Sequence, residues 1–385
     1  MQNLDATLEQ GIAAAGLPGA VAMVGDRDGQ TYAKAFGRRG IDTDVAMSLD
    51  TLFWFASMTK AITSTAALQL VERGQLELDA PIGSLLPDLA SPQVIEGFDD
   101  AGAPRLRPAK RAITLRHLLT HTAGIGYDFV NGDLLRARGP AGPPDAGSLD
   151  WLRAPLLFDP GDRWEYGMNT DWVGRAVEAA SGQSLDAYFV EHILGPLGMD
   201  DTGFVVPADK LGRLASMHLR GEDGSLTAVP SMALDSGTGE FLSGGGGLIG
   251  TGGDYMRFLR MILSGGVLDG VQILSPDSLR ALSTNQVGAL RAGVVASVAP
   301  HMALTFDRFS GLKTDWSLGF LINPFDDPRG GRSAGSLAWS GLANTHFWID
   351  PASNRVGLFL SQLLPFADAK VMEVVIGFER AVYGR

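Results

Sequence analysis

Segments typical of β-strands lie near the two ends of the chain, and helical patterns fill the middle. Near the N-terminus, residues 19–24 and 31–36 predict two strands joined by hairpin-forming turn residues. Strand-like runs return at residues 318–322, 345–349 and 356–360. Because a sheet must be assembled from strands that pack into one layer, we expect both ends of the chain to form one antiparallel sheet.

Helical periodicity predicts that residues 4–15 and 367–383 form terminal helices covering this sheet. The fold class is therefore α/β (α+β), with a mainly helical insertion. We expect two domains: a discontinuous sheet domain of residues 1–80 plus 285–385, and a helical domain of residues 81–284, with the functional site at their interface. Further helices are expected at residues 57–73, 115–119, 170–181, 185–193 and 254–263.

Composition excludes several classes of protein. The 385 residues carry 31 Lys and Arg against 43 Asp and Glu, a net charge of −12, which disfavours nucleic acid and anionic membranes as partners. With 45% hydrophobic and 19% charged residues, the chain has the balance of a packed globular protein. It has no cysteine, so disulfides, thiolate metal sites and cysteine nucleophiles are excluded.

The N-terminus has neither the basic segment nor the apolar segment of a secretory signal. Apolar runs elsewhere are broken well before the ~18 residues needed to span a bilayer. The sequence therefore predicts a soluble, cytoplasmic protein. It gives no indication of oligomeric state.

The strongest local motif places Ser57 and Lys60 three residues apart at the start of a predicted helix. At this spacing both side chains lie on one helix face, within mutual reach. A serine hydroxyl needs a base to become a nucleophile, and a desolvated lysine can serve as that base. The alternative is a serine that caps the helix, followed by a solvated lysine, but apolar residues flank Lys60 on both sides.

Other motifs follow in a recognisable order. The stretch at residues 115–124 begins with the short predicted helix, and a turn at residues 159–169 delivers Tyr166. A glycine-rich loop occupies residues 244–254, and Trp339-Ser340-Gly341 precedes a predicted strand. Together with Ser57 and Lys60, these motifs resemble the serine β-lactamase and penicillin-binding-protein superfamily. The chain is most similar to the class C-related branch known as family VIII carboxylesterases, over nearly its whole length.

The resemblance implies a β-lactamase-like fold and assigns roles to individual residues. Ser57 would be the acylated nucleophile, Lys60 its base partner and Tyr166 the second proton-transfer group. The backbone N–H groups of Ser57 and Leu342 would form the oxyanion hole. No metal or organic cofactor is implied.

Two departures from the family pattern bear on the substrate. Met168 occupies the position of an asparagine that would hold an amide, and Trp339 occupies that of a lysine that would pair with a carboxylate. Trp339, Ser340, Gly341 and Met168 are therefore expected to contact substrate. An indole at this position favours neutral, apolar groups.

These departures predict a serine carboxylesterase that hydrolyses small, largely uncharged esters through an acyl-enzyme on Ser57. An acyltransferase and a weak β-lactamase on the same fold are the nearest alternatives. A binding relative without turnover is a further alternative. The natural ester, its chain length and its stereochemistry are left open.

Three other patterns favour ordinary structure. Residues 331–335 match the G-x-S-x-G nucleophile elbow, but a turn precedes them and no later acid precedes His346. Residues 245–250 match G-x-G-x-x-G, but no clear strand leads into them, so tight turning before a helix is expected. His117 and His121 have metal-ligand spacing, but no third ligand suggests itself, which favours hydrogen-bonded histidines.

Aromatic residues that could line an acyl pocket or belong to the core are Trp54, Tyr127, Trp151, Trp316 and Trp348.

Overall fold

A seven-stranded antiparallel sheet forms the centre of the protein in the computed structural model, which describes residues 4–231, 237 and 239–384. The strand order is β13-β14-β15-β16-β17-β1-β2. The N-terminal strand β1 pairs with the C-terminal strand β17, Val21 lying opposite Leu360. The bounds are β1 Gly19–Gly25, β2 Gln30–Gly37, β13 Asp315–Trp316, β14 Leu321–Asn323, β15 Ser336–Gly341, β16 Thr345–Asp350 and β17 Arg355–Leu360.

Both faces of this sheet are covered, so β1 is buried along its whole length. Successive strand residues point to opposite faces. Ala20, Ala22 and Val24 accordingly pack with the terminal helices, whereas Val21 and Met23 belong to the main core on the other face. This double burial explains why β1 is apolar throughout instead of alternating.

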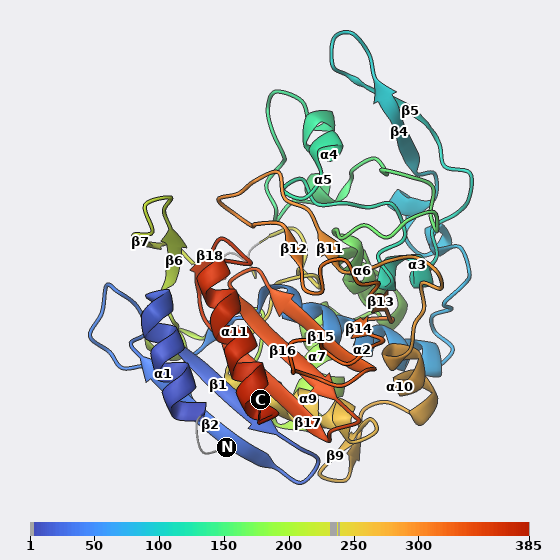
Figure 1. Cartoon of the computed structure of the whole chain (residues 1–385). Coiled ribbons are helices and arrows are strands. Elements are labelled where there is room, and N and C mark those ends of the chain that lie inside the picture. The colour runs from blue at the N-terminus through green and yellow to red at the C-terminus, as the bar shows by residue number, and fades with distance from the viewer. Residues whose placement is uncertain (1–3, 232–236, 238, 385) are drawn as a thin grey trace.

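The terminal helices α1 (Leu4–Ala15) and α11 (Ala369–Val382) lie side by side over one face of the sheet (Figure 1). On the opposite face, α9 (Gly252–Leu263) contacts β1, β16 and β17. The buried helix α2 (Thr59–Glu72) packs against α6 (Asn169–Ser181), which links the sheet to the region between the two chain ends.

That middle region contains short helices and small strands, with a β4–β5 hairpin projecting at the top of Figure 1. No described helix is long and apolar enough to cross a membrane. The remaining helices are α3 Leu115–Leu119, α4 Gly132–Ala137, α5 Leu149–Leu152, α7 Leu185–Phe189, α8 Gly195–Leu197 and α10 Pro276–Ser283. The small strands are β3 Phe53–Trp54, β4 Gln93–Phe98, β5 Pro104–Pro108, β6 Met217–Arg220, β7 Leu226–Val229, β8 Ile249–Gly250, β9 Val267–Leu268, β10 Val271–Gln272, β11 Val294–Val295, β12 Phe306–Asp307 and β18 Leu363–Leu364.

The predicted antiparallel sheet from both chain ends, covered by the terminal helices, is confirmed. Local boundaries differ in places. The predicted strand at residues 318–322 is displaced to Leu321–Asn323, because Ser317 and Phe320 close a turn just before it. Trp339-Ser340-Gly341 precedes the predicted strand, which is β16, and itself forms the end of β15, a strand that was not predicted. The domain boundaries at residues 80 and 285 stay a prediction.

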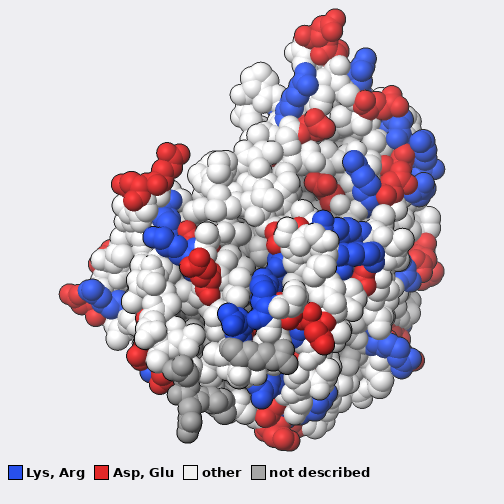
Figure 2. Space-filling model, in the orientation of Figure 1, with Lys and Arg blue, Asp and Glu red and all other residues white. Residues whose placement is uncertain are grey.

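Acidic and basic side chains are interspersed over the face seen in Figure 2, and uncharged surface separates them. The net charge of −12 is therefore not concentrated in one large acidic area on this face.

Candidate active site

Ser57 lies on a short 3-10 turn, Ala56–Met58, which leads directly into α2. The residue before it, Ala56, has a φ of 46°, in the left-handed region that non-glycine residues rarely adopt. Such backbone strain is found preferentially at functional sites. Here it brings Ser57 out of the core, half-buried, between residues that are themselves buried.

Lys60 is one turn further along and is only 2% exposed. Its Nζ lies within hydrogen-bond distance of Ser57 Oγ at 3.1 Å, the Tyr127 hydroxyl at 3.1 Å and the Gly245 carbonyl at 2.7 Å. A neutral amine in this position can donate to the Tyr127 hydroxyl and the Gly245 carbonyl and accept from the Ser57 hydroxyl. Nζ also lies 4.8 Å from the centre of the Tyr166 ring. The structure therefore brings the predicted serine and lysine together and compensates the buried amine.

Tyr166 approaches Ser57 from the other side. Its hydroxyl donates to Ser57 Oγ at 2.6 Å, and Trp339 Nε1 donates to the Tyr166 oxygen at 3.2 Å. The Tyr166 ring is fixed by neighbouring aromatic rings, with centroids 5.0 Å from both His121 and Trp339. Burial lowers the pKa of His121 well below its usual range, so this neighbour is neutral.

Strand β15 forms the wall next to Ser57. A Cβ on Gly341 would lie 2.2 Å from the Phe55 carbonyl oxygen, so only glycine lets the strand approach this closely. The approach places Leu342 and Ser57 together on the lining of one pocket. Ser340 lines the same pocket, and its Oγ lies 2.7 Å from His346 Nδ1.

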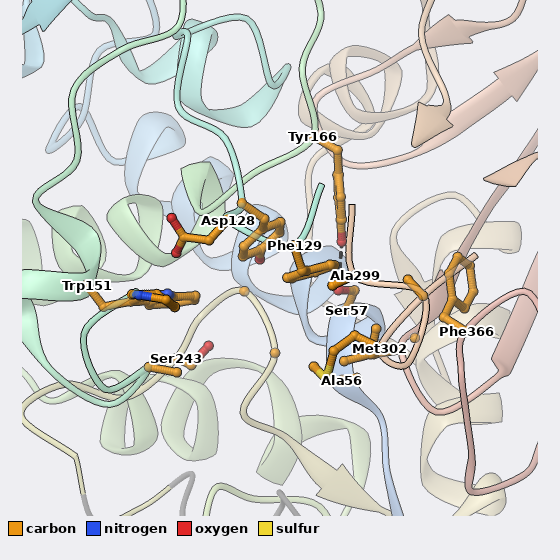
Figure 3. Close-up of a pocket in the computed structure, with 18 of the residues that line it drawn as sticks. Ala56, Ser57, Asp128, Phe129, Trp151, Tyr166, Ser243, Ala299, Met302 and Phe366 are labelled. Carbon is orange, nitrogen blue, oxygen red and sulfur yellow. Dashed lines mark hydrogen bonds between the residues drawn. The ribbon is translucent and has the colours of Figure 1, made fainter. Parts of the chain in front are cut away.

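The pocket that opens above Ser57 has a volume of about 940 Å³. In Figure 3 the Tyr166 hydroxyl points at Ser57, with Trp151 and Ser243 on one side of Ser57, Phe366 on the other side and Met302 below it. No lysine or arginine is among the described residues that line it. Of its two acids, Asp128 is paired with Arg138 at 3.0 Å and Asp145 is exposed. Apolar side chains that make much of the wall are Trp54, Phe129, Trp151, Phe241, Met302 and Phe366.

Comparison with known proteins identifies this arrangement. A family model described as Beta-lactamase matches residues 4–377. The chain belongs to the β-lactamase family. This membership and the fold confirm the superfamily predicted from the motifs.

Relatives of this β-lactamase family member include enzymes named for acyl chemistry. The chain is 36% identical to monacolin J acid methylbutanoyltransferase of Aspergillus terreus, over 96% of this chain and 92% of the relative. It is 31% identical to the lovastatin esterase of Penicillium rubens, over 96% of this chain and 94% of the relative. A solved structure of a simvastatin synthase mutant from Aspergillus terreus superposes with a TM-score of 0.84 and 33% identity, covering 99% of this chain and 96% of that one.

Met168 does not lie where the sequence analysis expects it. Its side chain is fully buried in the main core and is not among the residues that line the pocket. The preceding Gly167 packs against the Ile125 carbonyl, where a Cβ would lie 2.1 Å from the oxygen, and this close packing directs the start of α6 into the core. Met168 therefore makes no pocket surface, in contrast to Trp339, Ser340, Gly341 and Leu342.

Two side chains near Lys60, those of Tyr127 and Asp171, belong to the site although no local sequence pattern indicates it. The sequence predicts Tyr127 as a pocket or core aromatic, and its hydroxyl bonds to Lys60. Burial is the main cause that raises the pKa of Tyr127 well above its usual range, and the nearby Asp171 adds to it, so the hydroxyl stays neutral.

Asp171 resembles an ordinary acid in the first turn of a helix. Its distance from Tyr166, five residues along the chain, is the one signal that could have drawn attention to it.

Asp171 is completely buried beneath the glycine-rich loop. Its Oδ1 accepts hydrogen bonds from Ser243 Oγ at 2.6 Å and from the Gly245 N–H at 3.0 Å. Burial raises the pKa of the Asp171 carboxyl, and Lys60 and these two hydrogen bonds oppose that rise. Because both bonding partners are donors to one oxygen, the carboxyl acts here as an acceptor.

The glycines of the glycine-rich loop allow close packing, whereas the sequence predicts that they allow tight turning. None of residues 244–253 has a positive φ. A Cβ on Gly245 would lie 2.4 Å from Asp171 Oδ2, and one on Gly250 would lie 2.4 Å from Thr202 Oγ1. At the end of the loop Thr251 caps α9 by accepting from the Asp254 N–H.

The serine of the G-x-S-x-G match and the two spaced histidines do not line the pocket. Ser333, in the G-x-S-x-G match, is 2.8 Å from Ser353 Oγ and does not line the pocket. His117 accepts from the Thr114 N–H, and His121 Nδ1 lies 3.1 Å from the Asn169 amide. Both histidines are hydrogen-bonded, as predicted. Of the aromatic candidates, Trp54, Tyr127 and Trp151 line the pocket.

Proposed function

We propose that this protein is a serine carboxylesterase that hydrolyses small, largely uncharged esters by acylation of Ser57. The observation that carries the proposal is the position of Ser57 Oγ, 3.1 Å from Lys60 Nζ and 2.6 Å from the Tyr166 hydroxyl, in the lining of an apolar pocket. A nucleophile within hydrogen-bond distance of two proton-transfer groups is the arrangement that covalent acyl transfer requires. The assignment to family VIII carboxylesterases is part of this proposal.

Acylation starts with Lys60 as the neutral amine. Ser57 gives its hydroxyl proton to Lys60 as Oγ bonds to the ester carbonyl carbon, and the carbonyl oxygen becomes an oxyanion. The backbone N–H groups of Ser57 and Leu342 stabilise this charge. When the bond to the leaving alcohol breaks, Tyr166 protonates the alcohol oxygen and the proton held by Lys60 replaces the one that Tyr166 has lost.

Deacylation repeats these steps with water. Water takes the place of the alcohol, gives a proton to the Lys60 and Tyr166 pair, and bonds to the acyl carbon. The bond to Ser57 Oγ then breaks, Oγ recovers a proton, and the carboxylic acid leaves. Each proton that enters the pair is returned, so the enzyme is regenerated without a further reactant.

The charge of the pocket favours neutral substrates. A carboxylate bound next to Trp339 would find no lysine or arginine among the described lining residues. Leaving such a charge unpaired in an apolar site costs free energy. We therefore place β-lactam hydrolysis below ester hydrolysis, and expect nitrocefin to turn over slowly at best.

Acyl transfer to a second alcohol is the alternative that the pocket volume favours. A pocket of about 940 Å³ can hold an acyl group together with a sizeable alcohol. The relatives that are named as transferases also support acyl transfer as the alternative. Incubating the enzyme with a p-nitrophenyl ester and a primary alcohol distinguishes the two activities. Free acid as the main product supports the esterase, and a new ester as the main product supports the transferase.

A serine-reactive fluorophosphonate tests the proposal as a whole. We expect one equivalent of label on the tryptic peptide that contains Ser57, with parallel loss of activity on a short p-nitrophenyl ester. Folded protein that takes up no label and hydrolyses no ester would identify a binding relative instead. Label on a different serine, with loss of activity, would place the nucleophile elsewhere.

Replacing Trp339 by phenylalanine separates the packing of its aromatic ring from the hydrogen bond that its N–H donates to Tyr166. Trp339→Phe keeps an aromatic ring beside Tyr166 but deletes the N–H that donates to the Tyr166 oxygen at 3.2 Å. A hydrogen bond of this kind contributes about 0.5–1.5 kcal/mol, so kcat should fall roughly 3- to 10-fold. Steady-state kinetics with a short ester provide the measurement. An unchanged kcat would show that the indole N–H does not assist Tyr166.

A further inference from the structure

The glycine-rich loop connects a buried acid to the amine that lies next to Ser57. The N–H of Gly245 donates to Asp171 Oδ1 at 3.0 Å, and the carbonyl of the same residue accepts from Lys60 Nζ at 2.7 Å. The Lys60 contact is shorter than the 3.1 Å contacts that Lys60 makes with Ser57 and Tyr127. Gly245 therefore connects Asp171 to Lys60 through a single residue.

Asp171 is placed so that it can hold Gly245. It lies in the first turn of α6, which begins three residues after Tyr166, and it is 0% exposed. Ser243 Oγ donates to the same oxygen at 2.6 Å, so both ends of the segment 243–245 are attached to one carboxyl group. The absence of a Cβ on Gly245 allows this contact, because a Cβ would lie 2.4 Å from Asp171 Oδ2.

The charge of the Asp171 carboxyl is a second, independent connection between Asp171 and Lys60. Asp171 Oδ2 is buried and has no hydrogen-bond partner within the part of the chain that the structure describes. The groups that interact electrostatically with Asp171 are Lys60, from α2, and Tyr127, whose hydroxyl bonds to Lys60. A buried carboxylate is stabilised by a nearby cation, and the cation is stabilised equally by the carboxylate.

We propose that Asp171 is the positioning residue for Lys60 in the reaction of Ser57. Its hydrogen bonds hold Gly245 so that the carbonyl fixes the amine, and its negative charge stabilises the ammonium that forms when Ser57 loses its proton. This inference rests on the proposed function. It assigns a purpose to the glycine-rich loop, which resembles a nucleotide-binding sequence and instead connects α6 to Lys60.

The variant Asp171→Asn tests this role because it keeps the size of the side chain and an acceptor oxygen while it deletes the charge. We expect kcat for a short p-nitrophenyl ester to fall about 10- to 100-fold, since small displacements of catalytic groups have effects of this size. KM should stay within about twofold, since Asp171 is not among the residues that line the pocket. A purely structural role would lower the yield of folded protein and leave kcat per folded site unchanged.

Asp254→Asn is the matched control. Asp254 also lies in the first turn of a helix, α9, and also accepts from one hydroxyl and one backbone N–H, those of Thr202 and Asp201, both at 2.9 Å. It does not line the pocket. Asp254→Asn should lower the melting temperature without changing kcat. The inference is overturned if Asp171→Asn behaves in the same way.

Each rate is divided by the concentration of active sites, which is the amount of Ser57 that the fluorophosphonate labels when labelling is complete. Unfolded protein in the sample then does not lower the kcat. Wild-type protein that is neither labelled nor active contradicts the proposed function itself. Active wild type with an unaffected Asp171→Asn contradicts only the positioning role. If Asp171→Asn does not fold, Ser243→Ala decides, because it deletes one of the two donors to Asp171 Oδ1. A fall in kcat of about threefold supports the role, and an unchanged kcat overturns it.

Discussion

Ser57→Ala should reduce ester hydrolysis at least about 10⁴-fold, because removal of a covalent nucleophile has effects of this size or larger in serine hydrolases. Alanine keeps the backbone of the turn and deletes the one atom that bonds to both Lys60 and Tyr166. The loss should appear in kcat, measured with a p-nitrophenyl ester. Circular dichroism should show that the variant is folded.

Ser333→Ala provides the control for this prediction. Ser333 is the serine of the G-x-S-x-G match, and its Oγ contacts Ser353 and not the pocket. Its replacement should leave kcat and KM unchanged and affect only stability, by about 1 kcal/mol for the lost hydrogen bond. Retained activity in Ser57→Ala together with loss in Ser333→Ala would mean that the nucleophile had been assigned to the wrong serine.

Lys60→Met should lower kcat about 10³- to 10⁴-fold, near the upper end of what a general base contributes. Methionine matches the length of lysine and can fill the same buried space, but it cannot accept a proton. The change also leaves the Tyr127 hydroxyl and the Gly245 carbonyl without their donor, at a cost of about 1–3 kcal/mol for each buried group. Stability must therefore be measured by thermal unfolding alongside the kinetics.

Lys60→Arg separates the charge of this residue from its ability to exchange a proton. Arginine keeps a positive charge but does not give up its proton in proteins. If Lys60 is the base, Lys60→Arg should be as inactive as Lys60→Met. If Lys60→Arg instead retained a tenth or more of the wild-type kcat, Lys60 would act through its charge alone and another group would have to take the Ser57 proton.

The sequence predicts the parts of the fold that depend on local patterns. The apolar strand at residues 19–24, the terminal helices and the helix after Ser57 all have clear periodicity, and each appears in the structure within a few residues of its predicted bounds. Small paired strands such as β6 and β18 were not predicted. They are short, and β18 pairs in parallel with a strand far away in the sequence.

The same distinction applies to the candidate site. Ser57 and Lys60 meet because they are one helical turn apart, which the sequence states directly. The other partners of Lys60 are 67 and 185 residues away, at Tyr127 and Gly245, and no local pattern specifies such contacts. Met168 illustrates the reverse case: position within a family motif suggested the pocket, whereas tertiary packing placed this apolar side chain in the core.

Trapping the acyl-enzyme tests the central proposal most directly. The wild-type protein is mixed with an excess of an activated p-nitrophenyl ester, quenched in acid within the first turnover and digested for mass spectrometry. We predict an added mass of one acyl group on the peptide that contains Ser57, and no such adduct in Ser57→Ala. Ester turnover by the wild type without acyl on Ser57, or with acyl on any other residue, would contradict the proposal.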